Sequence, residues 1–162
     1  MRIIDALVFV FALGLFIYIS VHATPSLGPG KLTTASGEVS DFTMPLMREK
    51  IADKFTVDLT VHLPIIHPAG LHIIPDDKLE RLWVNGKEVK ISEPIEWESG
   101  GIVELNEYWT RGNNFLKLEM SDKGGKSALF IQYPANYRSI LNILKIFIVV
   151  GLFSYGLVRF AD

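Results

Sequence analysis

Two adjacent carboxylates, Asp76 and Asp77, follow an apolar segment in the sequence "LHIIPDDK". Carboxylate oxygens are the ligands that Ca²⁺ prefers, although a complete site needs about six to eight oxygens. Aspartates are also common in turns, where their side chains accept hydrogen bonds from backbone N–H groups. The pair therefore indicates either a turn or one part of a calcium site. We expect the turn by default, and calcium is the one cofactor that the sequence suggests.

A second set of candidate residues lies in the acidic loop "EPIEWESGG", where Trp97 stands between Glu96 and Glu98. An exposed indole can stack on a sugar ring while neighbouring carboxylates bind the hydroxyl groups of the sugar. These three residues are the candidate ligand-binding site. Trp83 and Trp109 lie in or beside predicted strands, and we expect both to pack in the core.

Catalysis finds little support in the sequence. Loop carboxylates could form a glycosidase pair, but that chemistry requires a separation of about 5 to 10 Å, which a sequence does not set. His62, His67 and His72 recur every fifth residue, a spacing that matches neither one face of a strand nor one face of a helix. The sequence has neither a glycine-rich phosphate loop nor a nucleophile elbow. We expect a protein that is not an enzyme.

The composition of the chain excludes further classes of function. The 162 residues include no cysteine, so disulfide and thiolate chemistry are absent and the fold depends on its apolar core. The formal net charge is −2, and acidic side chains outnumber basic ones between the two ends of the chain. Since no basic run is present, we expect neither nucleic acid nor a polybasic lipid-binding surface.

Long apolar runs lie at both ends of the chain. Residues 3–20 and 140–158 each contain one charged side chain. At about 1.5 Å per residue, a helix of either length spans a hydrocarbon core of about 30 Å. The sequence therefore predicts two transmembrane helices, within an N-terminal segment 1–23 and a C-terminal segment 139–162, with the lipid bilayer as a partner.

The first apolar run has an alternative interpretation. Arg2, the apolar stretch and the triplet "VHA" at residues 21–23 together resemble a cleavable signal peptide. The stretch is longer than the about 7 to 15 residues that are usual in such peptides. We expect an uncleaved anchor, and the signal peptide remains the alternative.

The flanking charges suggest an orientation. Arg2 and Arg159 lie on one side of the membrane, against Arg138 on the other and Lys145 just within it. Basic residues favour the cytoplasmic side, and a long loop is translocated largely regardless of its charge. We expect a two-pass protein of the cell (inner) membrane with both termini cytoplasmic. The central domain is then extracytoplasmic, or periplasmic.

Charged residues inside the predicted helices are candidates for assembly. Asp5 and Arg159 lie near the same end of an antiparallel hairpin and could pair with each other. Lys145 lies about 7.5 Å inside the outer end of the second helix. Its side chain could extend outward to the headgroups, or its amine could contact an acid of another subunit.

The central part carries strand patterns. The nine residues "FTVDLTVHL" alternate apolar and polar side chains, as expected of a strand with one buried face. Asn85-Gly86 predicts a tight hairpin, and several more short strands follow. We expect an all-β sandwich over residues 51–138, preceded by a spacer and first strand over residues 24–50, which are rich in Pro, Gly, Ser and Thr.

Several of these motifs resemble a known family. The segments "VNGKEV", "ELNEYWTRGNNFLKLEM" and "DKGGKSALFIQY" resemble the galactose-binding-like jelly-roll domains that accompany glycosidases. They resemble the protective-antigen-type lectins more loosely. The resemblance covers residues 55–133 and implies a jelly-roll fold. In those lectins an aspartate pair holds a calcium ion that contacts sugar hydroxyls, and Asp76-Asp77 occupies the matching place.

Together these features give two functional hypotheses. The first is a non-catalytic accessory subunit of a larger membrane or envelope complex, which docks through its β-sandwich and its transmembrane helices. The second is a membrane-tethered carbohydrate-binding module that holds a surface or nascent polysaccharide. An exposed apolar patch on one sheet would favour docking, whereas a groove lined by Trp97 and carboxylates would favour a sugar.

Overall fold

The structure is a computed structural model that describes residues 3–49, 51–64, 67–98 and 100–161. For residues 159–161 it describes the backbone alone. The chain divides into two compact units, which we describe separately. One contains both ends of the chain and is called the helical unit. The other, Pro25–Pro134, contains all of the strands and is called the β-domain.

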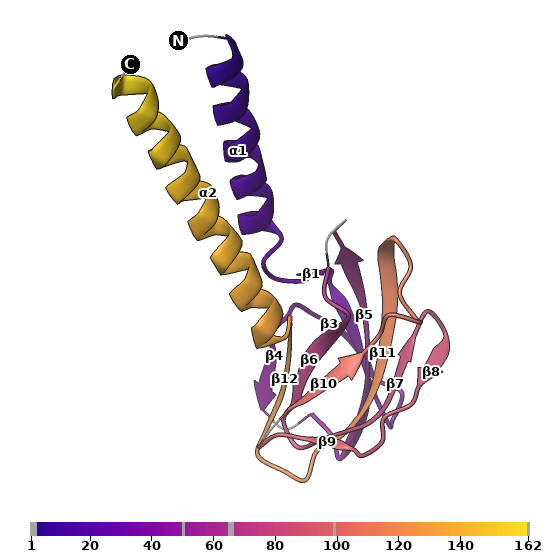
Figure 1. Cartoon of the computed structure of the whole chain (residues 1–162). Helices are drawn as coiled ribbons and strands as arrows, with labels where there is room; N and C mark the ends of the chain where they lie inside the picture. The colour runs from indigo at the N-terminus through magenta and orange to yellow at the C-terminus, as the bar shows by residue number, and fades with distance from the viewer. Residues whose placement is uncertain (1–2, 50, 65–66, 99, 162) are drawn as a thin grey trace. The chain divides into compact units, whose positions relative to one another are not determined.

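The helical unit consists of α1, Ile3–Val21, and α2, Ala135–Ala161 (Figure 1). Both helices are long and apolar enough to cross a membrane, α1 over all of its 19 residues and α2 over the 24 residues Ala135–Val158. Their exposed side chains are mostly apolar, as lipid-facing side chains must be. The two predicted helices are therefore present, and α2 begins four residues before the boundary expected at residue 139.

Residues 24–50, expected to form a spacer and a first strand, contribute four strands to the β-domain. Leu32, Phe42 and Leu46 are buried in that region, so it adds apolar side chains to the core. Its prolines lie between or before the strands, whereas several of its Gly, Ser and Thr residues lie within them. These strands are β1 Ser26–Leu27, β2 Gly30–Thr34, β3 Val39–Phe42 and β4 Leu46–Glu49.

The remaining eight strands follow along the chain and are separated by turns and loops. They are β5 Lys54–Leu63, β6 Gly70–Pro75, β7 Lys78–Val84, β8 Lys87–Val89, β9 Ile95–Glu96, β10 Gly101–Glu104, β11 Gly112–Ser121 and β12 Lys126–Gln132.

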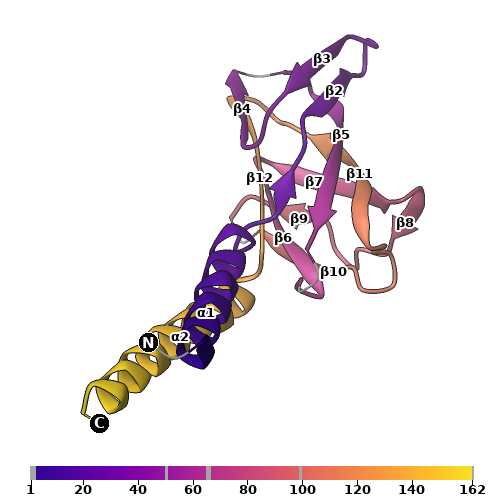
Figure 2. The same ribbon diagram turned by 90° about the horizontal axis from the view of Figure 1, so that it is seen from above.

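These strands form two antiparallel sheets. The larger has eight strands, with the path β3-β2-β5-β11-β7-β8, while β1 pairs with β5 and β9 pairs with β7. The smaller has four strands in the order β10-β6-β12-β4. Strands distant in sequence, such as β5 and β11, lie side by side (Figures 1 and 2). A mostly β structure with two terminal helices is thus confirmed.

The core follows the predicted alternation. In β5 every second side chain from Phe55 to Leu63 is buried, and the residues between them are partly or fully exposed. The neighbouring strand β11 shows the same alternation, with Leu116 and Leu118 buried. Because both sheets bury one face within a single compact unit, each also has an outer face.

Asn85 and Asn114 organise the loops at one end of the large sheet. Asn85 and Gly86 have φ angles of 52° and 79° and connect β7 to β8, as the hairpin prediction requires. Asn114 is fully buried, and its Oδ1 accepts hydrogen bonds from Asn85 Nδ2 at 2.8 Å and from the Thr110 N–H at 2.7 Å. Its Nδ2 donates to the carbonyl oxygens of Thr110 and Gly112. This network satisfies a buried amide completely.

Candidate functional site

The two aspartates lie between β6 and β7. Asp77 Oδ2 accepts a hydrogen bond from the backbone N–H of Lys123, and the Asp77 carbonyl oxygen accepts one from the N–H of Trp97 at 3.2 Å. Burial raises the pKa of Asp76, and the carboxylates of Asp122 and Asp77 raise it further. Asp77 thus makes a backbone contact of the kind expected of a turn carboxylate.

A third carboxylate, Asp122, is nearby and buried. Its Oδ1 accepts a hydrogen bond from the N–H of Gly124 at 2.8 Å, and its Oδ2 accepts one from the hydroxyl of Ser127. Both of its oxygens are therefore engaged within the protein. Within the described ranges, no three Asp, Glu or His side chains are grouped so that they could hold a metal ion. The calcium hypothesis stays a prediction.

Trp97, the candidate ligand contact, lies in the turn after β9 and is 49% exposed. Its ring centroid is 6.5 Å from that of Phe130, with the two ring planes inclined by 48°. Glu96 and Glu98 on either side are exposed. Since Phe130 belongs to β12, Trp97 enlarges the outer surface of the four-stranded sheet.

Apolar side chains continue from Trp97 across that outer surface. In β6, Leu71 and Ile73 are buried, whereas Ile74 belongs to the alternate set that remains partly exposed. The same alternation brings side chains of β4, β10 and β12 to this surface. We call the surface the apolar face, and its large side chains are Met47, Ile74, Trp97, Ile102 and Phe130.

The strand register places these side chains together. Phe130 lies directly opposite Ile74, and Ile102 lies opposite His72 on the other side of β6. His72 Nδ1 is 3.3 Å from Gln132 Nε2 on β12. Met47 and Ile102 are 63% and 58% exposed. The sheet thus presents apolar groups to solvent on a face that in a solvated antiparallel sheet is usually polar.

Gly100 packs closely against the apolar face. It has a φ of +56°, and a Cβ atom there would lie 2.7 Å from His72 Nε2 and 2.8 Å from Ile74 Cγ1. Only glycine combines this backbone conformation with such an approach. The acidic loop that carries Trp97 is therefore held tightly against β6.

Acidic side chains surround the apolar face. Glu49 lies two residues beyond Met47 on β4, and Glu104 lies two residues beyond Ile102 on β10, so each shares the outer face of its strand. Others come from the loop around Trp97. We call this set the acidic rim, and its exposed members are Glu49, Glu93, Glu96, Glu98 and Glu104.

The rim includes an open depression of about 760 Å³ beside the edge strand β10. Glu93, Glu96 and Glu104 line it together with Lys90. The depression therefore has an excess of negative charge and is bounded by the strand that carries Ile102.

The outer face of the eight-stranded sheet is different, because charges of opposite sign alternate across it. Residues in direct register on six strands form one row, which we call the charged face. From β3 to β8 the row consists of Asp41, Lys31, Asp58, Lys117, Trp83 and Glu88.

Trp83 is a correction to the expectation of core packing. It is only half-buried, and Lys117 Nζ lies 5.6 Å from the centroid of its ring, a cation–π contact. The strand alternation explains the difference, since Leu82 and Val84 are the buried neighbours. Trp83, Lys117 and the exposed Phe115 line an open depression of about 670 Å³. Trp109 is also half-buried, with its indole Nε1 shielded from solvent.

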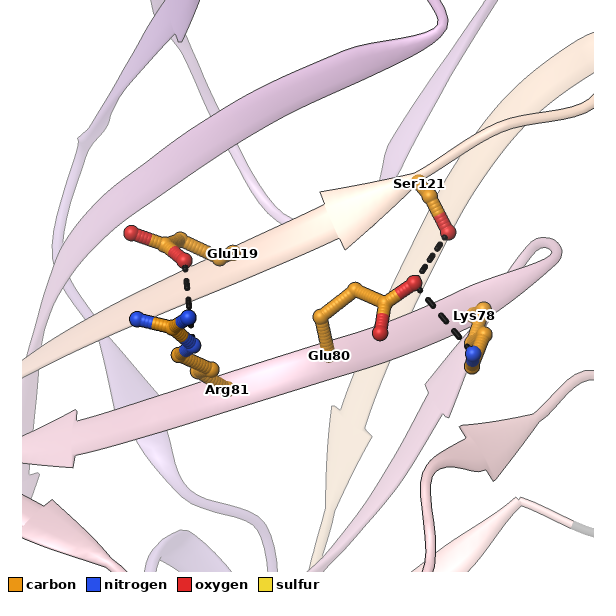
Figure 3. A network of polar contacts seen from close by, with 5 residues as sticks. All are labelled: Lys78, Glu80, Arg81, Glu119 and Ser121. Carbon is orange, nitrogen blue, oxygen red and sulfur yellow. Dashed lines mark hydrogen bonds and ion pairs between the residues drawn. The ribbon is translucent and has the colours of Figure 1, made fainter.

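More charge pairs lie further along the same sheet (Figure 3). Arg81 Nε is 3.8 Å from Glu119 Oε2. Glu80 Oε1 accepts a hydrogen bond from the Ser121 hydroxyl at 3.0 Å and lies 3.3 Å from Lys78 Nζ. Burial alone would raise the pKa of Glu80, but the Ser121 hydrogen bond and Lys78 outweigh it and lower that pKa. This sheet therefore neutralises its own charges locally.

In the helical unit, Asp5 Oδ1 accepts a hydrogen bond of 2.5 Å from the hydroxyl of Tyr155. The predicted partner of Asp5 was Arg159, whose side chain lies outside the described residues. Lys145 is half-buried and belongs to the less exposed positions 141, 145, 148, 152 and 155, whose spacing of three and four residues defines one face of α2 that includes Tyr155. Because Tyr155 contacts α1, Lys145 lies toward α1 rather than on the fully exposed side of the helix.

Comparisons with known proteins give little further information. No protein-family model matches the sequence, and no curated protein matches it. Part of the chain is similar in structure to an α-L-rhamnosidase of Streptomyces avermitilis solved with L-rhamnose, at 18% identity and a TM-score of 0.36. The matched region covers 71% of this chain and 10% of that protein. A likeness at this TM-score carries no argument about fold or function.

Proposed function

We propose that this chain is a non-catalytic accessory subunit of a larger integral membrane complex. The β-domain docks on the partner, and the two helices anchor the subunit in the bilayer. The observation that carries the proposal is the apolar face, an exposed apolar patch on one sheet of a small domain. Such patches mark interaction surfaces, because a large apolar area in contact with water is unfavourable.

The composition of the apolar face favours a protein partner over a sugar. Met47, Ile74 and Ile102 are aliphatic or thioether side chains, which pack well against other apolar side chains but offer no hydrogen bonds to hydroxyl groups. Fully burying one side chain of this size contributes about 1.5 to 3 kcal/mol. Several such contacts around two aromatic rings could form the energetic centre of an interface.

The proposed topology has both termini in the cytoplasm and the β-domain on the periplasmic side of the cell (inner) membrane. The arginines at the ends of the chain support it through their preference for the cytoplasmic side. The contact of Asp5 with Tyr155 supports retention of α1, because cleavage of a signal peptide would remove the partner of Tyr155. We also propose the galactose-binding-like jelly roll as the fold type of the β-domain.

Cysteine labelling tests this topology, and the chain has no natural cysteine to interfere. Ser36→Cys should react with a membrane-impermeant maleimide applied to the periplasmic side. Asp162→Cys should react only after the membrane is permeabilised. The reverse pattern would overturn the proposed orientation.

We propose Lys145 as a residue of intramembrane assembly. An amine that is half-buried inside an apolar helix is unfavourable unless it reaches the headgroups or an acceptor. A partner helix that approaches the α1 side of α2 could supply a carboxylate or a carbonyl oxygen. Lys145→Leu should then weaken assembly, whereas a lysine that only extends to the headgroups would tolerate the change.

The alternative is a membrane-tethered carbohydrate-binding module. The specific observation in its favour is that Trp97 is exposed between two exposed carboxylates, so an indole face and hydrogen-bond acceptors are both accessible. Calcium at Asp76 and Asp77 would strengthen this alternative. A chelator should leave the thermal unfolding of the protein unchanged if no ion is bound, and a large decrease in Tm would favour the carbohydrate module.

The docking proposal is tested with two matched substitutions. Ile102 and Phe115 are 58% and 64% exposed and lie on the two opposite outer faces. Ile102→Asp should remove the copurifying partner after extraction in mild detergent, whereas Phe115→Asp should not. A single species from the unaltered protein, or equal behaviour of both variants, would contradict the proposal.

A further inference from the structure

The charge around the apolar face is strongly unbalanced. Five exposed glutamates form the acidic rim, and the basic residues near them are few. Lys126 lies opposite Glu49 in the register of β12 and β4, and Lys78 lies opposite Glu96 in the register of β7 and β9. Lys90 lies in the depression beside β10. The negative charge therefore exceeds the positive charge around a surface whose centre is apolar.

The charged face provides an internal reference for this imbalance. There, Lys31 and Lys117 both lie directly opposite Asp58, one on each side of it. Opposite charges placed across neighbouring strands stabilise the sheet itself. In the strand register that the structure describes, Glu49 and Glu96 each lie opposite one lysine, whereas Glu104 lies opposite Gly70. The rim therefore matches only part of its negative charge, and the remainder is available to a second molecule.

This charge distribution excludes some occupants of the apolar face. If two copies of the chain met through the same face, two acidic rims would oppose each other, and like charges across an interface are costly. A bilayer surface rich in anionic lipids would be repelled for the same reason. A protein surface of opposite charge has neither disadvantage.

We infer that the partner presents an apolar patch surrounded by lysine and arginine side chains. The inference rests on the proposed docking function and adds the chemistry of the partner. The apolar centres contribute the contact area, and the charges of the two rims set orientation and speed the encounter. The depression beside β10 accommodates one or more basic side chains next to Glu93, Glu96 and Glu104.

The test reverses charge on the rim and leaves the apolar centre intact. In the full-length chain, Glu96→Lys combined with Glu104→Lys should reduce recovery of the copurifying partner by about tenfold or more. The control combines Asp41→Lys with Glu88→Lys, which makes the same change of charge on the charged face. The control should recover as much partner as the unaltered chain. Thermal unfolding identifies any variant that fails to fold.

A milder variant keeps the test decisive if lysines disturb the fold. Glu96→Gln with Glu104→Gln removes the charge and preserves the shape of both side chains. Partner recovery should then depend less on salt concentration than it does for the unaltered chain, because fewer charge pairs remain to be screened.

The outcomes separate this inference from the docking proposal. If Ile102→Asp removes the partner but both rim variants retain it at every salt concentration, docking stands and the basic partner surface is wrong. If Ile102→Asp also retains the partner, the docking proposal itself fails. Loss of the partner in the rim variants, with full recovery in the control, supports both.

Discussion

The two outer faces of the β-domain arise from the same strand alternation but expose different chemistry. On the eight-stranded sheet, the outward positions hold a row of alternating charges in direct register. On the four-stranded sheet, the outward positions of β6 and β12 hold Ile74 and Phe130. The first face exposes Phe115 but matches most of its outward charges within the sheet, whereas the second gathers apolar side chains from four strands and the Trp97 loop in contact with water. The comparison indicates which face the function uses.

The substitution with the largest expected effect on stability tests whether the two outer faces depend on a shared core. Asn114→Ala removes an amide that makes several buried hydrogen bonds, so groups of Asn85 and Thr110 lose their partner. We expect a loss of about 2 to 4 kcal/mol in the free energy of unfolding. Urea unfolding of the detergent-solubilised chain, followed by tryptophan fluorescence, measures it.

The neighbouring residue is the control for that change. Asn113 is exposed, and its Oδ1 lies 2.9 Å from His62 Nδ1 at the surface. Asn113→Ala should cost less than about 1 kcal/mol, because water replaces a lost surface contact. Equal losses at the two positions would show that burial of Asn114 does not determine its importance.

A smaller effect should be specific to the apolar face. Gly100→Ala places a Cβ against His72 and Ile74 at a positive φ, so we expect a loss of about 1 to 3 kcal/mol. Gly37→Ala is the matched control: its φ is +83°, but no atom lies within 4 Å of the added Cβ. A substantially larger loss at Gly100 than at Gly37 would demonstrate the close packing of the Trp97 loop. Similar losses would mean that only the backbone angle matters.

The smallest expected effect on stability comes from the carboxylate of Asp76. The pKa of Asp76 is raised above 3.8, so the folded state disfavours the ionised carboxylate, and stability falls as pH rises through the pKa values of the unfolded and folded states. Asp76→Asn removes this loss. Its Tm should exceed that of the unaltered protein at pH 7, and the difference should vanish at pH 3. Asp77→Asn weakens the acceptor for the Lys123 N–H and should lower the Tm at pH 7.

A Tm for Asp76→Asn that is lower than that of the unaltered protein at pH 7 would contradict the raised pKa. It would also favour the calcium hypothesis if added calcium stabilised only the unaltered chain.

The sequence predicted the elements better than their surfaces. Apolar length revealed the helices, and the period of two in β5 identified which side chains are buried. Trp83 was misplaced because its position in a strand suggested burial, although its neighbours Leu82 and Val84 already occupied the inward positions. Residues 24–50 were expected to hold a spacer and one strand, but they hold four short strands, and prolines between those strands suggested a spacer. In both regions local composition obscured the alternation that places side chains on one face or the other.

The apolar face was missed for a related reason. The run "LHII" in β6 carries apolar residues at both inward and outward positions, a pattern that signals a strand covered on both sides. That signal was available, but four strands had to be brought into register before their outward residues formed one surface. Tyr155 was also missed, because a hydroxyl in an apolar helix gains meaning only once Asp5 is known to lie beside it.

The central claim is that the apolar face is covered in the assembled complex and the charged face is not. Ile102→Cys and Phe115→Cys introduce single thiols into a chain without cysteine, one on each face. Maleimide labelling is measured in native membranes opened on both sides, and again after a detergent that dissociates the complex. We predict that Ile102→Cys is protected in membranes and labelled after dissociation, while Phe115→Cys is labelled in both. Rapid labelling of Ile102→Cys in native membranes would contradict the account.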